Sequence, residues 1–191
     1  MKVNEVNLII AGIGGQGVLL ASEIIAETLV RAGYDVKMSV AYGMAQRGSP
    51  IVSHIRAGKK IYSPLISKGQ ADIVIVMDMT GTQSWIDFLK KDSQVFMLDK
   101  YTFSPMAAMV SHKLKRKIKK KHKEIIFIPY DKAFKDLKDI KTLNVFMIGV
   151  LSNYFSIKKE NWIKIIRKKA PPRIKNINIA VFKLGRQGRY C

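Results

Sequence analysis

The chain has 191 residues, of which 48% are hydrophobic, with 34 Lys and Arg residues against 14 Asp and Glu residues. A chain of this length can form one domain and bury about 70% of its unfolded surface around a hydrophobic core. No apolar run reaches the roughly 18 residues of a membrane span, and the N-terminal residues lead into a predicted strand without a signal sequence. We therefore expect one cytoplasmic domain over residues 1–191, with a basic C-terminal tail at about 171–191.

The few cysteine and histidine residues argue against a metal centre. The single cysteine, Cys191, excludes an internal disulfide, and an iron–sulfur cluster held by this chain alone would need about four thiolates. His54, His112 and His122 lack the spacing of metal ligands, and the last two lie within a lysine run. The sequence therefore predicts no metal site.

The formal net charge of +20 suggests three interpretations. A basic surface can bind nucleic acid or a large acidic partner, or it can reflect a lysine-rich proteome. The lysines are spread over many segments, and the densest run, residues 112–123, has no aromatic residue for base stacking. A nucleic-acid-binding module is therefore the least favoured function.

The first third of the chain predicts a strand, a glycine turn and a helix. Residues 6–11 form an apolar run interrupted only by Asn7, and residues 18–32 carry apolar side chains at helical spacing up to a glycine C-cap at Gly33. A glycine turn permits positive φ angles and directs backbone N–H groups outward, which suits a phosphate or carboxylate. The candidate binding residues of this turn are Gly12, Gly14, Gly15, Gln16 and Gly17.

The turn also matches the spacing of a dinucleotide-binding fingerprint. That fingerprint needs an acidic residue about 20 positions later, at the end of the second strand. Here the second strand is predicted at 35–40, and Asp35 stands at its beginning. A turn that only packs the helix on the sheet is at least as well supported as a nucleotide site, and NAD binding is less well supported than either.

The remaining elements alternate between strands and helices. Further strands are predicted at 51–56, 71–78, 94–98 and 124–129, with an extended piece at 61–66. Helices are predicted at 80–90, 130–140, 143–155 and 158–169, and the basic stretch at 104–123 forms a surface helix or loop. The tail 173–191 is predicted to be mostly irregular, with residues 178–182 as an apolar anchor. This pattern predicts an α/β protein, a three-layer α/β/α fold that is Rossmann-like with a mixed sheet.

Four motifs in a fixed order give the chain a family resemblance. They are residues 10–17, residues 43–48, residues 62–66 and Gly69-x-Ala71-Asp72. Together they resemble the small, beta/gamma-type subunit of 2-oxoacid:ferredoxin oxidoreductases, and the Met-Ala-Gln-Arg sequence at 44–47 is most similar to the indolepyruvate branch.

The resemblance extends to the C-terminal part, through Asn144, Gly149, Pro171-Pro172 and the pattern 178–185. Two departures stand out: Ser49-Pro50 follows Arg47-Gly48 where the family has a second glycine, and Asp78 stands where glutamate is common. The proline fixes φ and removes an N–H donor, so the first departure can alter the loop geometry.

The resemblance implies a part in the oxidative decarboxylation of a 2-oxoacid to an acyl-CoA, with electrons passed to ferredoxin. Such enzymes use thiamine diphosphate, magnesium and iron–sulfur clusters. This chain has one cysteine and no Gly-Asp-Gly followed by Asn-Asn. We therefore expect these cofactors on a large partner subunit, with no catalytic or metal-binding residue here and with CoA as a candidate shared substrate.

Two loops are expected to face the active site of that partner. The second loop adds Met44, Gln46, Arg47 and Gly48 to the residues of the glycine turn. Arg47 could pair with a carboxylate or a CoA phosphate, or form only an inter-subunit salt bridge, and both interpretations stay open. The alternative function is a stand-alone Rossmann-like protein that binds a nucleotide or CoA.

Overall fold

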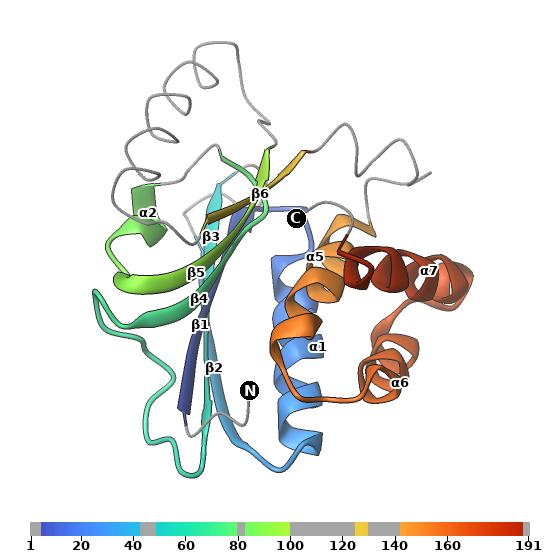
Figure 1. The fold of residues 1–191 in the computed structure, drawn as a ribbon, viewed down its shortest axis with the longest axis horizontal. Coiled ribbons are helices and arrows are strands. Elements are labelled where there is room, and N and C mark those ends of the chain that lie inside the picture. The colour runs from blue at the N-terminus through green and yellow to red at the C-terminus, as the bar shows by residue number, and fades with distance from the viewer. Residues whose placement is uncertain (1–4, 43–48, 80–82, 100–124, 130–141, 189–191) are drawn as a thin grey trace.

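The computed structural model describes residues 5–42, 49–79, 83–99, 125–129 and 142–188, and it contains one mixed six-stranded sheet with helices (Figure 1). The strands follow the order β2-β3-β1-β4-β5-β6. Their bounds are β1 (Glu5–Ile13), β2 (Asp35–Tyr42), β3 (Pro50–Gly58), β4 (Ala71–Val76), β5 (Leu89–Asp99) and β6 (Ile125–Pro129). The helices are α1 (Val18–Arg31), α2 (Gln83–Ile86), α5 (Leu143–Leu151), α6 (Lys159–Lys169) and α7 (Lys175–Arg186), and short 3-10 turns cover Ser152–Tyr154 and Pro172–Ile174. The predicted α/β class with a mixed, Rossmann-like sheet is confirmed.

The strand β1 lies inside the sheet, and its sequence explains why. Its side chains from Leu8 to Ile10 are completely buried, as is typical of a strand covered on both faces. It pairs with β4 in parallel and with β3 in antiparallel orientation, with Ile9 opposite His54. The strand β2 pairs in turn with β3 in antiparallel orientation. These antiparallel pairs make the sheet mixed, as predicted.

One face of the sheet carries the helices α1, α5, α6 and α7 (Figure 1). The helix α5 is buried along its whole length, and α7 crosses it at close range. A Cβ atom added to Gly149 would lie 2.3 Å from the carbonyl oxygen of Phe182, and one added to Gly185 would lie 2.2 Å from that of Phe146. Glycine at these two positions therefore lets the two helix backbones approach each other closely.

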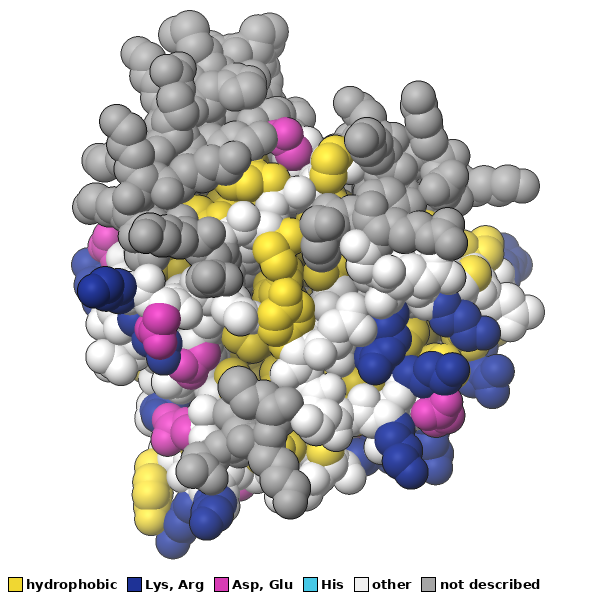
Figure 2. All heavy atoms as spheres, viewed as in Figure 1, with side chains coloured by type: hydrophobic (Ala, Val, Ile, Leu, Met, Phe, Trp, Pro, Cys, Tyr) yellow, Lys and Arg dark blue, Asp and Glu magenta, His cyan; other side chains and the backbone are white. Residues whose placement is uncertain are grey.

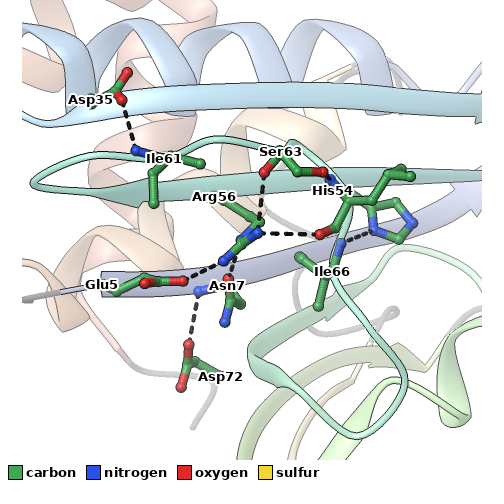
Figure 3. Close-up of polar contacts among 10 residues, drawn as sticks. Glu5, Asn7, Asp35, His54, Arg56, Ile61, Ser63, Ile66 and Asp72 are labelled. Carbon is green, nitrogen blue, oxygen red and sulfur yellow. Dashed lines mark hydrogen bonds and ion pairs between the residues drawn. The ribbon is translucent and has the colours of Figure 1, made fainter.

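The opposite face carries α2 and the segment 61–66, which we call the strap. The buried side chains of Ile66 and Trp85 pack there against a second apolar cluster that includes Ile9 and Val74. The strap runs outside the sheet, and hydrogen bonds from side chains of β2 and β3 hold its backbone (Figure 3).

Two predictions about secondary structure were wrong. The tail is not mostly irregular, because residues 175–186 form the helix α7, whose apolar side chains Ile179 and Phe182 pack into the main core. The predicted helix at 80–90 ends early, because the described helix α2 ends at Ile86 and Leu89 begins β5 opposite Ala71. Pairing with β4 outweighed the local helical pattern there.

Some predicted features lie outside the described residues, namely the helix at 130–140, the stretch 104–123 and the loop 43–48. Among the residues that the structure describes, no helix is long and apolar enough to cross a membrane. Lys and Arg side chains gather over α6 and α7 on the visible face of the molecule (Figure 2).

Candidate functional site

The candidate site lies at the edge of the sheet where the parallel strands β1 and β4 end. The glycine turn leads there from β1 into α1, and β3 begins beside it with Pro50 paired to Ile13. In open α/β sheets, ligands bind outside the carboxyl ends of the parallel strands. The turn therefore stands where a binding edge is expected.

Two glycines of the turn have backbone angles that other residues rarely adopt. Gly15 has φ of 100° and Gly17 has φ of 75°, and Gly17 caps the N-terminus of α1. The N–H group of Gly14 donates to the carbonyl oxygen of Ser49 at 3.0 Å. This bond attaches the turn to the residue that follows the predicted second loop.

The side chain of Gln16 fixes the shape of the turn. Its Oε1 accepts a hydrogen bond from the N–H of Ile13 at 3.0 Å, and its Nε2 donates to Oδ2 of Asp78 at 2.8 Å. A Cβ atom on Gly12 would lie 3.0 Å from this Oε1 and 2.8 Å from Cγ2 of Val18. Glycine at position 12 therefore leaves the space that the Gln16 amide and the start of α1 occupy.

A second amide side chain joins the turn to the helix α5. Nδ2 of Asn144 donates to the carbonyl oxygen of Gly17 at 3.2 Å, and Oδ1 of Asn144 accepts from the N–H of Val145 at 2.9 Å. A Cβ atom on Gly17 would lie 2.4 Å from Nδ2 of Asn144. Glycine is thus required at position 17 both for its φ angle and for this close approach.

The structure brings Gly12, Gly14, Gly15, Gln16 and Gly17 together in one turn, as the sequence suggested. Met44, Gln46, Arg47 and Gly48 lie outside the described residues. The predicted set missed Asp78 and Asn144, which are buried at 3% and 2% exposure. The family resemblance was the only indication that these two residues matter. Their partners in the turn are 62 and 127 positions away in the sequence.

The geometry does not fit an ordinary dinucleotide site. In such folds the second strand lies next to the first and ends near the ribose. Here the antiparallel β3 separates β2 from β1. Asp35 begins β2 at the far edge, and it accepts a hydrogen bond from the N–H of Ile61 at 2.7 Å, which is the largest of the interactions that lower its pKa.

The edge combines a helix N-terminus with neutral amides and one buried carboxylate. The first turn of α1 has no acidic residue, so its dipole favours a negatively charged group nearby. Within the described ranges, no group of three or more His, Cys, Asp or Glu side chains is placed to hold a metal ion. The described part of the edge is suited to binding and positioning, and it presents no nucleophile paired with a base.

Comparison with known proteins decides the family. The family model described as pyruvate ferredoxin/flavodoxin oxidoreductase matches residues 7–188. The chain belongs to this family. It is therefore a subunit of a 2-oxoacid:ferredoxin oxidoreductase, an enzyme assembled with partner subunits.

Curated members of the family align with nearly the whole chain. The indolepyruvate oxidoreductase subunit IorB of Thermococcus kodakarensis is 29% identical over 192 residues, which cover 96% of this chain and 95% of the relative. The protein of the same name from Archaeoglobus fulgidus is 28% identical over 189 residues, with 95% and 94% coverage.

Solved structures of family members share the fold. The gamma subunit of a keto/oxoacid ferredoxin oxidoreductase from Geobacter sulfurreducens has a TM-score of 0.72 at 17% identity, over 97% of this chain and 96% of its own. A 2-oxoglutarate:ferredoxin oxidoreductase from Magnetococcus marinus, with 2-oxoglutarate, coenzyme A and succinyl-CoA bound, has a TM-score of 0.73 at 18% identity. The match covers 97% of this chain and 31% of that one.

Proposed function

We propose that this chain is the small subunit of an indolepyruvate or arylpyruvate ferredoxin oxidoreductase. The complex would decarboxylate the oxoacid oxidatively, transfer the acyl group to CoA and pass the electrons to ferredoxin. The observation that carries the proposal is the end-to-end similarity to relatives named indolepyruvate oxidoreductase subunit IorB, at up to 29% identity. The Met-Ala-Gln-Arg sequence at 44–47 supports the same branch.

The cofactors are assigned to a large partner subunit. An iron–sulfur cluster needs about four thiolates, and the whole chain offers only Cys191. The sequence also lacks the thiamine diphosphate and magnesium signature. Since the residues present do not fit these groups, the proposed role of this chain is structural support and substrate positioning.

Within that role, we place the glycine turn against the active site of the large subunit. The support is geometric: the turn stands at the carboxyl edge of the parallel strands, and hydrogen bonds to Gln16 and Asn144 hold its backbone. The loop of Met44, Gln46, Arg47 and Gly48 precedes Ser49, whose carbonyl oxygen accepts from Gly14. We propose that Arg47 pairs with the oxoacid carboxylate or a CoA phosphate.

Anaerobic purification of the chain from its own cells, with everything bound to it, tests the proposed function. We expect a large subunit that contains thiamine diphosphate and iron–sulfur clusters, and a complex that reduces ferredoxin faster with indolepyruvate than with pyruvate or 2-oxoglutarate. Recovery of the chain alone, without activity, would contradict the proposal. The stand-alone alternative would then be tested by binding of NAD(P), FAD and CoA.

The role of Arg47 is tested in the assembled enzyme with Arg47→Ala. If the residue holds substrate, the KM for CoA or for the oxoacid rises while the complex stays assembled, and Arg47→Lys restores part of the loss. If KM and kcat are unchanged and assembly weakens, Arg47 is an interface residue and the positioning role is wrong.

A further inference from the structure

The strap presents its large side chains in two directions. Ile61 and Ile66 point inward at 4% exposure each, whereas Tyr62 and Leu65 are 82% and 60% exposed. The connection between β3 and β4 protrudes at the lower left of Figure 1, and the same corner of Figure 2 shows apolar and basic side chains next to one another. Large apolar side chains grouped on a surface commonly mark an interaction site.

Side chains of the sheet hold the backbone of the strap in place (Figure 3). The Arg56 guanidinium donates to the carbonyl oxygens of Ser63 at 3.2 Å and Leu65 at 3.4 Å. The same guanidinium is itself held by Oδ1 of Asn7 at 2.9 Å and by Glu5 at 2.5 Å.

Both ends of the strap are fixed as well. Oδ2 of Asp35 accepts from the N–H of Ile61 at 2.7 Å, and Nδ1 of His54 accepts from the N–H of Ile66 at 3.2 Å. The ordering entropy of the strap is therefore lost on folding and not on binding, which favours affinity. Three separate side chains, of Asp35, His54 and Arg56, thus hold the backbone that carries the two exposed apolar groups.

The positive charge around the strap indicates which kind of partner surface would fit it. Residues 56–70 contain four cations and no Asp or Glu. Arg56 is paired with Glu5 and Lys68 with Asp87, so Lys59 and Lys60 carry the positive charge that a partner would meet, and Nζ of Lys60 lies 5.2 Å from the centre of the Tyr62 ring. A second copy of this chain would bring like charges together on a molecule of net charge +20. An apolar cleft with carboxylates on its rim fits the surface better.

We propose that the strap is the docking surface for the large subunit, with Tyr62 and Leu65 inserted in an apolar cleft that has an acidic rim. The inference rests on the proposed function. The strap runs from the level of Glu5, where Asp35 holds Ile61, to the level of Ile9, where His54 holds Ile66. At 3.3 Å per strand residue, it therefore lies about 13 to 26 Å from the end of β1 at the glycine turn. A subunit that reaches both would cover the face that carries the strap, and we place the face covered by α6 and α7 outside this interface.

The test uses the complex of full-length chains. Tyr62→Ser combined with Leu65→Ser is expected to raise the Kd for the large subunit by about 100-fold, because two central apolar contacts are lost. Val30→Ser combined with Ile177→Ser is the matched control, since these residues are also exposed, at 53% and 43%, on helices of the other face. The control should leave the Kd within about twofold, and the melting temperature of each free variant establishes that it is folded.

A second variant tests the charge. Lys59→Glu combined with Lys60→Glu should slow association about tenfold at low salt, with a smaller effect at high salt. If the wild-type chain binds the large subunit and the Tyr62/Leu65 variant binds equally well, the docking inference is wrong and the proposed function stands. If the wild-type chain does not bind the large subunit at all, the proposed function fails. If it instead self-associates through Tyr62 and Leu65, the strap is a homodimer contact and the inference is overturned.

Discussion

The helices on one face of the sheet are held by contact between apolar surfaces, whereas the strap on the other face is held by directed polar bonds. At the crossing of α5 and α7, Gly149 and Gly185 allow the two backbones to touch. At the strap, Arg56, His54 and Asp35 bind backbone groups that no neighbouring strand satisfies. The helix crossing depends on the small volume of its glycines, and the strap depends on individual hydrogen-bonding groups. The stability of the two faces should therefore respond differently to substitution.

The largest effect is expected at the helix crossing. Alanine in place of a helical glycine normally stabilises by about 1 kcal/mol, but in Gly185→Ala the new Cβ would meet the Phe146 carbonyl oxygen at 2.2 Å. We expect a loss of about 3 kcal/mol in the free energy of unfolding, measured by urea denaturation. Asn176→Ala, an exposed change in the same helix, should stay within about 0.5 kcal/mol. A stabilised Gly185→Ala protein would show that the crossing is not tightly packed.

Removal of the guanidinium should release the strap with a smaller loss. Arg56→Ala leaves the carbonyl oxygens of Ser63 and Leu65 and the amide oxygen of Asn7 without this donor, at a cost of about 2 kcal/mol. Trypsin should then cleave after Lys60 faster than in the wild-type protein, because the strap opens more often.

Lys37→Ala is the matched control for Arg56→Ala. The ammonium group of Lys37 forms an exposed ion pair with Asp35 at 3.4 Å, and exposed pairs contribute little to stability. Urea denaturation should find this variant within about 0.5 kcal/mol of wild type, with unchanged cleavage. Equal effects of the two substitutions would mean that net charge, and not the strap contacts, determines the result.

The strap should also respond to pH. Burial lowers the pKa of His54, so the unfolded chain binds a proton at a higher pH than the folded chain does. Stability is therefore highest above the ordinary histidine value of about 6.5, and it falls as the pH drops from there toward the lower folded-state pKa. Protonation also removes the Nδ1 acceptor of the Ile66 N–H.

His54→Asn keeps an acceptor oxygen near the position of Nδ1 but does not titrate. Urea midpoints measured from pH 8 to pH 5.5 should decline for the wild-type protein and stay level for this variant, with a total effect smaller than that of Arg56→Ala. Parallel curves for the two proteins would show that another group is responsible.

The smallest loss of stability is expected for an ion pair on the surface of the face that carries the helices. Nζ of Lys168 on α6 lies 2.8 Å from Oε1 of Glu27 on α1, and this hydrogen bond is the main cause of the lowered pKa of Glu27. Lys168→Ala should cost about 0.5 kcal/mol, because the pair is partly exposed. NMR titration should find the Glu27 pKa raised toward its ordinary value, and an unchanged pKa would contradict the contact.

The local parts of the candidate site could be predicted, and its long-range partners could not. The glycine spacing at 12–17 is a property of adjacent residues, so the turn was identified from the sequence. Asp78 and Asn144 reach the turn only after β4 and α5 are in place. Nothing in the sequence near either residue indicates that contact.

The same distinction holds for the fold. The sequence by itself determined the strand, turn and helix of residues 6–32 and the strand at β4, because each depends on local periodicity or on a residue with unusual backbone freedom. Only the tertiary structure decided that residues 175–186 form a helix and that Leu89 belongs to a strand. Both outcomes follow from packing against α5 and pairing with β4, which contribute more free energy than local propensity.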